Sequence, residues 1–121
     1  MSESRTMTYV AAIGEGVRTV LNEQENAFIA GEDVAQAGSV FGYYRGLLEE
    51  FGDNRVFDTP ISEKGIMGLG VGAAATGCPA ILDIMFMDFI AECMDEIVNQ
   101  MAKMRYMFGG AAQLPVTVLT M

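Results

Sequence analysis

Apolar residues near the N-terminus recur at the spacing of an amphipathic helix. Successive apolar positions are three or four residues apart, so they share one face of a helix. These positions are Val10, Ile13, Val17 and Leu21. Thr6 or Thr8 places a hydroxyl where it can accept a hydrogen bond from the first free N–H groups. The pattern predicts a helix over at least residues 10–21.

Short apolar runs farther along the chain predict four strands, at residues 27–31, 55–58, 79–85 and 115–121. Polar residues end the first run, and the small turn-forming residues at 34–42 predict an irregular segment. Residues 44–51 predict a short helix. Thr59 and Pro60 predict a second helix start, with threonine as the cap and proline in the first position. That helix is expected to run to about Thr76.

Residues 88–107 are expected to form one continuous helix. Its apolar stripe consists of Ile90, Met94, Ile97, Met101, Met104 and Phe108. Acidic side chains lie early in this segment and basic ones late, which suits the helix dipole. The following glycine pair, Gly109 and Gly110, is typical of a helix end.

Helices that alternate with short apolar strands are typical of an α/β domain, with a parallel sheet covered by helices on both faces. We expect a tail at residues 1–7 and one domain at residues 8–121. The chain stops at the end of an apolar strand, which natural domains seldom do. We therefore expect the domain to be truncated at its C-terminus.

Acidic residues outnumber basic ones by 16 to 7, and the net charge is −9. Nucleic acid and anionic membranes need Lys and Arg, so both are poor partners. Residues 65–82 carry no charge and reach the length of a membrane span. Their glycines and Pro79 instead favour a glycine-rich helix followed by a buried strand. The polar residues 1–5 do not resemble a signal peptide, so we expect a cytoplasmic protein.

The chain contains no histidine and two cysteines. Without histidine, Ser-His-Asp and Cys-His catalysis and most zinc sites are excluded. Proton transfer must then come from carboxylates, Lys, Tyr or a cofactor. We interpret Cys78 and Cys93 as reduced core thiols rather than a disulfide, and we predict no metal site.

Three candidate positions follow the predicted strands, at the edge where open α/β sheets bind their ligands. Glu32 follows the first strand, Glu63 follows the second, and residues 86–89 (FMDF) follow the third. On pattern alone, Glu32 is a solvated loop acid. The two phenylalanines of the last segment are, on the same grounds, core residues.

Glu63 has two interpretations that the pattern leaves open. As an acid in the first turn of a helix, it complements the helix dipole. As a carboxyl group among apolar neighbours such as Ile61 and Ile66, it can exchange a proton with a ligand nitrogen. Burial would favour the neutral carboxyl and the helix N-terminus the charged one, so the pattern does not decide.

Seven motifs, in matching order and spacing from about Thr8 onward, resemble the β subunits of 2-oxo acid dehydrogenase E1 components. They lie at residues 31–34 (GEDV), 46–52 (GLLEEFG), 55–63 (RVFDTPISE), 71–74 (VGAA), 86–89 (FMDF), 97–100 (IVNQ) and 103–106 (KMRY). The combination is specific, whereas no single motif is. The resemblance implies that residues 8–121 are part of the pyrimidine-binding (Pyr) domain of a thiamin-diphosphate enzyme.

The resemblance also implies roles for individual residues. Glu63 would hydrogen-bond a ring nitrogen of the aminopyrimidine and promote the imino tautomer that takes the proton from the thiazolium carbon. Phe89 would stack on the pyrimidine ring. Glu32 would lie in the polar network beside it, and Ile61 and Met85 would line the site.

The family's partner α subunit holds the diphosphate and its magnesium, and the acyl group passes to a lipoyl-bearing E2 protein. The family's β subunit continues into a histidine-bearing loop and a second domain. We therefore expect half a coenzyme site here and no activity from the chain alone. Residues 84–89 and 105–107 look closer to acetoin- or pyruvate-type β subunits than to the branched-chain type.

Two other hypotheses remain. A transketolase or deoxyxylulose-phosphate synthase relative would share the Pyr domain, although residues 59–63 (TPISE) argue against it. A non-catalytic, stand-alone domain would only self-associate, through its glycine-rich helix and the acidic, methionine-rich helix.

We predict a dimer or higher homo-oligomer. The glycine-rich helix and the final strand would otherwise leave apolar surface exposed to water. Light scattering measures the mass directly, and a monomeric mass would contradict this prediction.

Overall fold

A four-stranded parallel sheet forms the centre of the computed structural model, which describes residues 5–121. The strand order is β2-β1-β3-β4. The strands are β1 (Phe28–Gly31), β2 (Val56–Asp58), β3 (Ala80–Asp83) and β4 (Val116–Leu119). The helical elements are α1 (Tyr9–Glu23), α2 (Leu47–Phe51), α3 (Glu63–Ala75), η1 (Met87–Cys93), η2 (Glu96–Met101) and α4 (Met104–Met107). All four predicted strands are therefore present.

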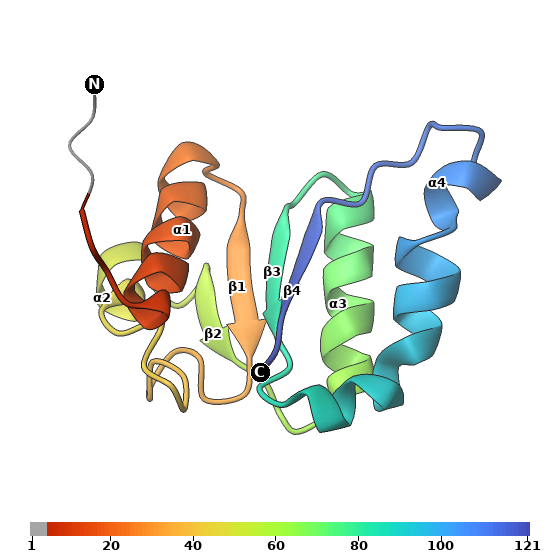
Figure 1. The fold of residues 1–121 in the computed structure, drawn as a ribbon. Coiled ribbons are helices and arrows are strands. Elements are labelled where there is room, and N and C mark those ends of the chain that lie inside the picture. Colours follow the sequence, from red (N-terminus) through yellow and green to blue (C-terminus); the bar gives the residue numbers. More distant parts are fainter. Residues whose placement is uncertain (1–4) are drawn as a thin grey trace.

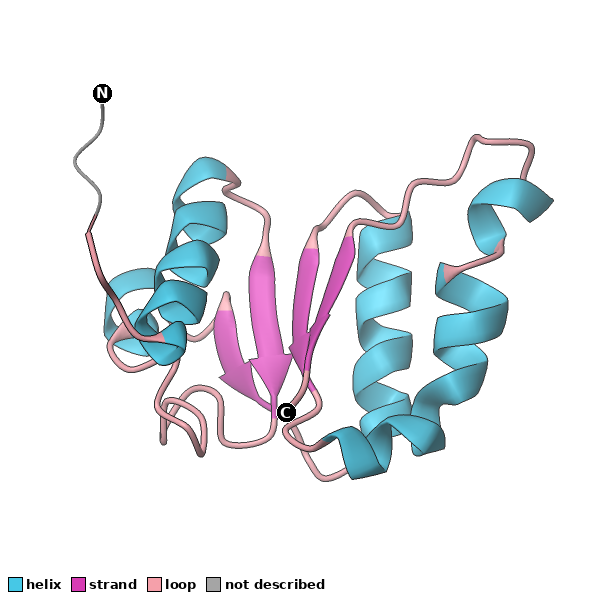
Figure 2. Cartoon of the chain, in the orientation of Figure 1, coloured by secondary structure: helices cyan, strands magenta, loops and turns pink. Residues whose placement is uncertain are grey.

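Helices cover both faces of the sheet, as the sequence predicts (Figures 1 and 2). One buried cluster joins the α1 and α2 side to the sheet and includes Leu21, Ile29 and Ile81. A second joins α3, η1 and η2 to the opposite face and includes Met67 and Leu82. Neighbouring residues of one strand enter different clusters because strand side chains alternate between faces. The α/β fold class is confirmed.

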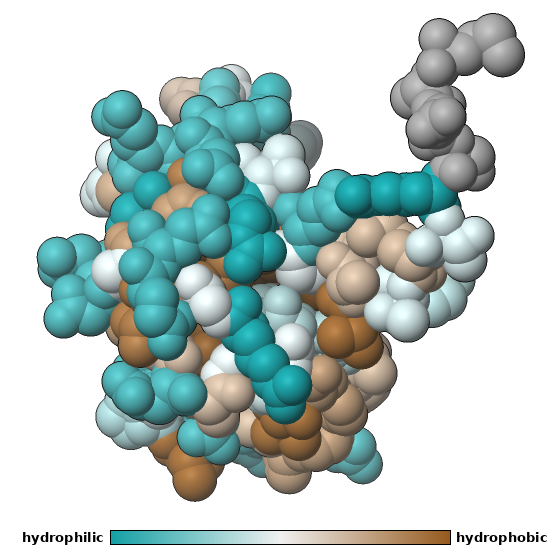
Figure 3. All heavy atoms as spheres, turned by 90° about the vertical axis from the view of Figure 1, so that its left-hand side faces the viewer, coloured by the Kyte–Doolittle hydropathy of each residue, from teal (hydrophilic) through white to brown (hydrophobic). Residues whose placement is uncertain are grey.

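The outer surface on the α1 and α2 side is hydrophilic over most of its area, with apolar side chains mainly in its lower half (Figure 3). Within residues 5–121, no helix has the length and apolar character needed to cross a membrane.

Both cysteines are free thiols, and Cys93 is fully buried, as predicted.

Helix α3 begins at Glu63 with Ser62 as its cap, so the prediction of a start at Thr59 and Pro60 is wrong. The Thr59 N–H donates to the carbonyl of Gly31 at 2.9 Å, which continues the pairing of β2 with β1. The residue before a proline also avoids helical backbone angles. The chain therefore stays extended for several residues before the helix starts.

The prediction of one continuous helix over residues 88–107 is also wrong. The segment consists of the 3-10 helix η1, the π-helix η2 and the short α-helix α4. These helices have different numbers of residues per turn, so an apolar stripe spaced for an α-helix does not stay on one face. Ile90, Ile97 and Met101 pack against the core, whereas Met94 and Phe108 are exposed.

The short helix expected at residues 44–51 begins only at Leu47, because Gly46 has a left-handed backbone. The cap expected for the first helix is confirmed: the N–H of Ala11 donates to the Thr8 hydroxyl.

In the glycine-rich helix α3, Gly70 lies directly against Leu82 of β3, where a side chain would clash. Gly68 and Gly72 face open space instead.

Arg55 ties the end of α1 to the start of the sheet. Its guanidinium donates to the carbonyl oxygens of Leu21 at 2.7 Å, Gln24 at 2.6 Å and Ala27 at 2.8 Å. It also lies 5.3 Å from the ring centre of Phe51. One planar, forked cation thus satisfies carbonyl groups at a helix C-terminus, where free acceptors and negative dipole charge gather.

We predict that Arg55→Lys lowers the free energy of unfolding by about 1–3 kcal/mol, because an ammonium keeps the charge but cannot reach all three carbonyls. Urea unfolding measures the change. Arg105→Lys, at an exposed position, is the matched control and should shift the free energy by less than about 0.5 kcal/mol. Equal effects of the two substitutions would contradict this account of Arg55.

Candidate functional site

The chain reverses its direction across the sheet between β1 and β3. From β1 it passes to β2 on one side, and from β3 it passes to β4 on the other. Open α/β sheets bind ligands in the crevice outside the carboxyl ends of the strands at such a reversal, and here that place lies beyond the ends of β1 and β3. Gly31 and Asp83 are paired at this point, and Asp58 of β2 is paired with Gly31 on the other side.

Carboxyl groups gather at this edge. Partial burial, with the negative charges of Glu63, Asp33 and Asp83, raises the pKa of the Glu32 carboxyl above its usual value. Glu63 stands in the first turn of α3 and is half-buried. The structure thus brings Glu32 and Glu63, which the sequence singled out, to the same edge of the sheet.

Asp83 joins this group, although sequence reasoning did not assign it to the site. Its side chain is 6% exposed, and burial raises the pKa of its carboxyl. The N–H of Met85 donates to Oδ1 at 2.6 Å, and this bond together with the nearby Tyr44 hydroxyl offsets part of the rise in pKa. The Tyr44 hydroxyl lies near the carboxylate without reaching full hydrogen-bond geometry. Asp83 is the only charged residue in its predicted strand. A lone charge in an otherwise apolar strand is the feature from which its place in the site could have been predicted.

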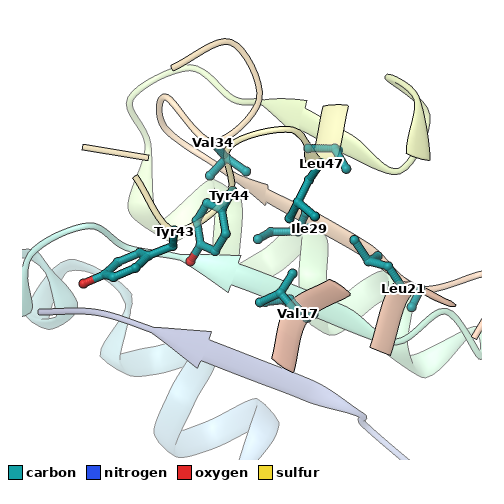
Figure 4. Close-up of a cluster of buried hydrophobic side chains, with 10 residues drawn as sticks. Val17, Leu21, Ile29, Val34, Tyr43, Tyr44 and Leu47 are labelled. Atoms are coloured by element: carbon teal, nitrogen blue, oxygen red, sulfur yellow. The ribbon is translucent and has the colours of Figure 1, made fainter. Parts of the chain in front are cut away.

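Tyr43 and Tyr44 close the α1 side of this region and lie side by side at one end of the buried cluster (Figure 4), with ring centres 5.7 Å apart. Burial is the main cause that raises the pKa of both hydroxyls, and the Asp83 charge adds to it. A small pocket is lined by Ile13, Tyr43, Asp83 and the end of β4. The acid of β3 is therefore enclosed by aromatic and apolar groups.

The segment after β3 carries the other predicted site residues. Met85 has a left-handed backbone, with φ of 49°, and is half-buried. Phe86 and Phe89 meet edge to face with ring centres 6.3 Å apart, and Phe86 also contacts Phe41. Phe89 is 46% exposed, so part of its ring is free for a ligand. Ile61 is 83% exposed and belongs to neither buried cluster.

Asp58 fixes the loop that carries Glu32. Its two carboxylate oxygens accept from the N–H groups of Ala35 at 2.7 Å and Gln36 at 3.2 Å. Sequence reasoning missed this contact because it joins segments more than twenty residues apart. Among residues 5–121, no cluster of His, Cys, Asp and Glu has the arrangement of a metal site.

Residues 5–121 match the family described as transketolase, pyrimidine binding domain. The chain belongs to this family. It is 45% identical to the β subunit of the acetoin:2,6-dichlorophenolindophenol oxidoreductase of Bacillus subtilis, covering 97% of this chain and 38% of that protein. It is 46% identical to the pyruvate dehydrogenase E1 component subunit β of Bacillus subtilis, covering 93% and 34%. The Staphylococcus epidermidis counterpart is 43% identical, covering 94% and 35%.

This chain therefore spans about a third of the length of the curated relatives it matches. The resemblance to E1 β subunits and the membership of the pyrimidine-binding family are confirmed. The individual coenzyme contacts assigned to Glu32, Ile61, Glu63, Met85 and Phe89 stay predictions. For Ile61, a role in lining the site requires a contact from outside the residues that now surround it.

We predict that Glu32→Gln stabilises this pyrimidine-binding domain at neutral pH. The pKa of Glu32 is higher in the folded chain than in the unfolded chain. Its charge therefore destabilises the folded state once the pH passes the unfolded pKa, and the penalty is complete above the folded pKa. Urea unfolding at pH 7 should give a higher free energy for the variant, and the gain should vanish at lower pH.

The exposed Glu25, placed before β1, offers a control in which Glu25→Gln removes the same charge far from the crevice. If both variants change stability equally at every pH, the effect comes from net charge, and the proposed crowding of acids at the crevice is wrong.

Proposed function

We propose that this chain is the pyrimidine-binding part of the β subunit of a thiamin-diphosphate-dependent 2-oxo acid dehydrogenase E1. The whole enzyme would decarboxylate pyruvate or a related 2-oxo acid, or cleave acetoin, and transfer the acyl group to the lipoyl group of E2. The observation that carries this proposal is the position of Glu63, at the start of α3 and close enough to Glu32 to raise its pKa.

The residues at the crevice fit an aminopyrimidine. Thiamin diphosphate carries a positively charged thiazolium, and the described residues near the crevice that affect Glu32 are all acidic. A partly exposed aromatic ring, Phe89, is available to stack on a flat heterocycle. When bound, the coenzyme supplies the electron sink for decarboxylation. We propose that Met85 lines the same space from the turn after β3.

In this proposal, Glu63 holds and moves a proton at a pyrimidine ring nitrogen. A carboxyl group suits this task because it can donate in one protonation state and accept in the other. Glu32 would lie beside Glu63 in the same polar network, since the charge of Glu63 helps to raise the pKa of the Glu32 carboxyl. Ile61 would shield the outer side of the ring once a partner covers it.

The partners are also proposals. An E1 α subunit would hold the diphosphate and magnesium, and E2 would receive the acyl group. The protein would be cytoplasmic and homo-oligomeric. Gly68 and Gly72 support association, because open space at both positions lets another helix approach closely. The same feature favours the second candidate, a non-catalytic domain that only self-associates.

A chimera tests the proposal. We would replace the matching third of the Bacillus subtilis pyruvate dehydrogenase β subunit with this chain, and coexpress the chimera with the α subunit of that enzyme. The chimera should decarboxylate pyruvate when thiamin diphosphate is present. Glu63→Gln should lower kcat by roughly a hundredfold or more, as expected for loss of a proton-transfer group.

Glu23→Gln, at the exposed end of α1, removes the same charge and should leave kcat unchanged. The chain by itself should show negligible coenzyme binding in calorimetry. Submicromolar affinity of the isolated chain, or full activity of the Glu63→Gln chimera, would overturn the proposal.

A further inference from the structure

The backbone turns sharply where β3 ends. Met85 has a φ of 49°, in the left-handed region that residues with side chains avoid because Cβ crowds the carbonyl. Among residues 5–121, only Asp33 and Ser39 share this property without being glycine. Such a conformation persists only when surrounding contacts impose it, and it often marks a functional segment.

Two sets of hydrogen bonds hold this turn. On one side, the Met85 N–H donates to Asp83 Oδ1 at 2.6 Å. On the other, the N–H of Met121 donates to the Met85 carbonyl at 3.1 Å, and the N–H of Met87 donates to the Met121 carbonyl at 2.7 Å. Asp83 provides the only side chain among these hydrogen bonds. A substitution at Asp83 can therefore remove its bond to Met85, whereas the backbone bonds remain.

Burial of the Asp83 carboxylate costs free energy, and no ion pair among the described residues offsets it. The side chain is 6% exposed, and the ion pairs present among residues 5–121 are Arg5 with Glu15, Arg18 with Glu50, and Lys64 with Glu96. None of them involves Asp83. A buried carboxylate without a cation destabilises a fold, and an apolar residue of similar size would stabilise it.

The turn determines where the aromatic rings lie. Phe86 follows Met85 directly, and its ring contacts both Phe41 and Phe89 edge to face. A right-handed backbone at Met85 would redirect the chain before Phe86 and carry the Phe86 ring away from Phe41, whereas Phe86 and Phe89 both follow this turn and would move together. The contact between Phe86 and Phe41, and with it the place of the segment that carries Phe89, therefore depends on the conformation of Met85, which Asp83 holds.

We propose that Asp83 is a positioning residue, whose carboxylate keeps Met85 left-handed and so presents the Phe89 ring to the crevice. The inference rests on the proposed function only in treating Phe89 as the surface that receives the pyrimidine. The turn geometry itself is independent of any ligand. The buried carboxylate of Asp83 lowers the stability of the fold, but it keeps the aromatic surface in a fixed position.

The first experiment measures the turn in the 121-residue chain by NMR. The intraresidue NOE between the amide and α protons of Met85 is strong only when φ is positive. Asp83→Asn keeps an acceptor oxygen and should retain both this NOE and the NOE between the Phe41 and Phe86 rings. Asp83→Leu removes the acceptor and should lose both, while its urea midpoint stays equal or rises.

Asp83→Ala serves the same purpose if the leucine variant does not fold. Asp88→Asn, which removes an exposed acid from the same segment, is the matched control and should change nothing. A Met85 NOE that remains strong in Asp83→Leu or Asp83→Ala would overturn the proposal.

The second experiment measures coenzyme affinity in the chimera described above. Asp83→Leu should weaken thiamin-diphosphate binding roughly tenfold to a hundredfold, the scale of effect expected from a misplaced binding group. Asp83→Asn should restore it to within about threefold, since the acceptor is kept. Unchanged affinity in the leucine variant would contradict the positioning role. If the unaltered chimera fails to bind coenzyme, the proposed function is wrong, and the NMR result still decides the role of Asp83.

Discussion

Strands β1 and β3 pair closely at Gly31 and Asp83, and this pairing fixes the geometry of the elements around it. A Cβ at Gly31 would lie 2.6 Å from the Asp83 carbonyl oxygen and 2.9 Å from Val34 Cγ2, so glycine is the residue that lets the strands meet. The same glycine is paired with Asp58 on its other side. Both helix layers and the crevice are arranged around this central row of three residues.

Asp58 and Asp83, the two aspartates of this row, have similar structural roles. Asp58 accepts from the backbone of the loop that follows β1, and Asp83 accepts from the backbone of the turn that follows β3. Each acid therefore fixes a segment that leaves the carboxyl edge. The loop carries Glu32 and the turn precedes Phe89, so strand pairing determines the positions of both. The accumulated negative charge at this edge opposes folding but favours a cationic ligand.

Sequence reasoning found the parts of the fold that follow from periodicity. The four strands, the first helix with its Thr8 cap, and the covered sheet all appear as predicted. It failed where backbone pairing or changing helical pitch overrides local pattern. Thr59 remains extended because it still pairs with Gly31, and the segment after Phe86 changes helix type twice.

In the candidate site, too, some residues could be predicted from the sequence and others could not. Glu32 and Glu63 could be placed at one edge because parallel strands end together. Asp58 and Asp83 could not be assigned, because their contacts depend on how a loop and a turn fold back onto the sheet. Their chemical identity is visible in the sequence, but the backbone groups that they hold are not.

A crystal structure of the chimera with the α subunit and bound thiamin diphosphate would show directly where the coenzyme binds. We predict that the aminopyrimidine lies outside the carboxyl ends of β1 and β3, with a ring nitrogen within hydrogen-bond distance of Glu63 and the ring against Phe89. A pyrimidine bound elsewhere, for example in the apolar groove between α1 and β4 lined by Val17, Val20 and Val116, would contradict it.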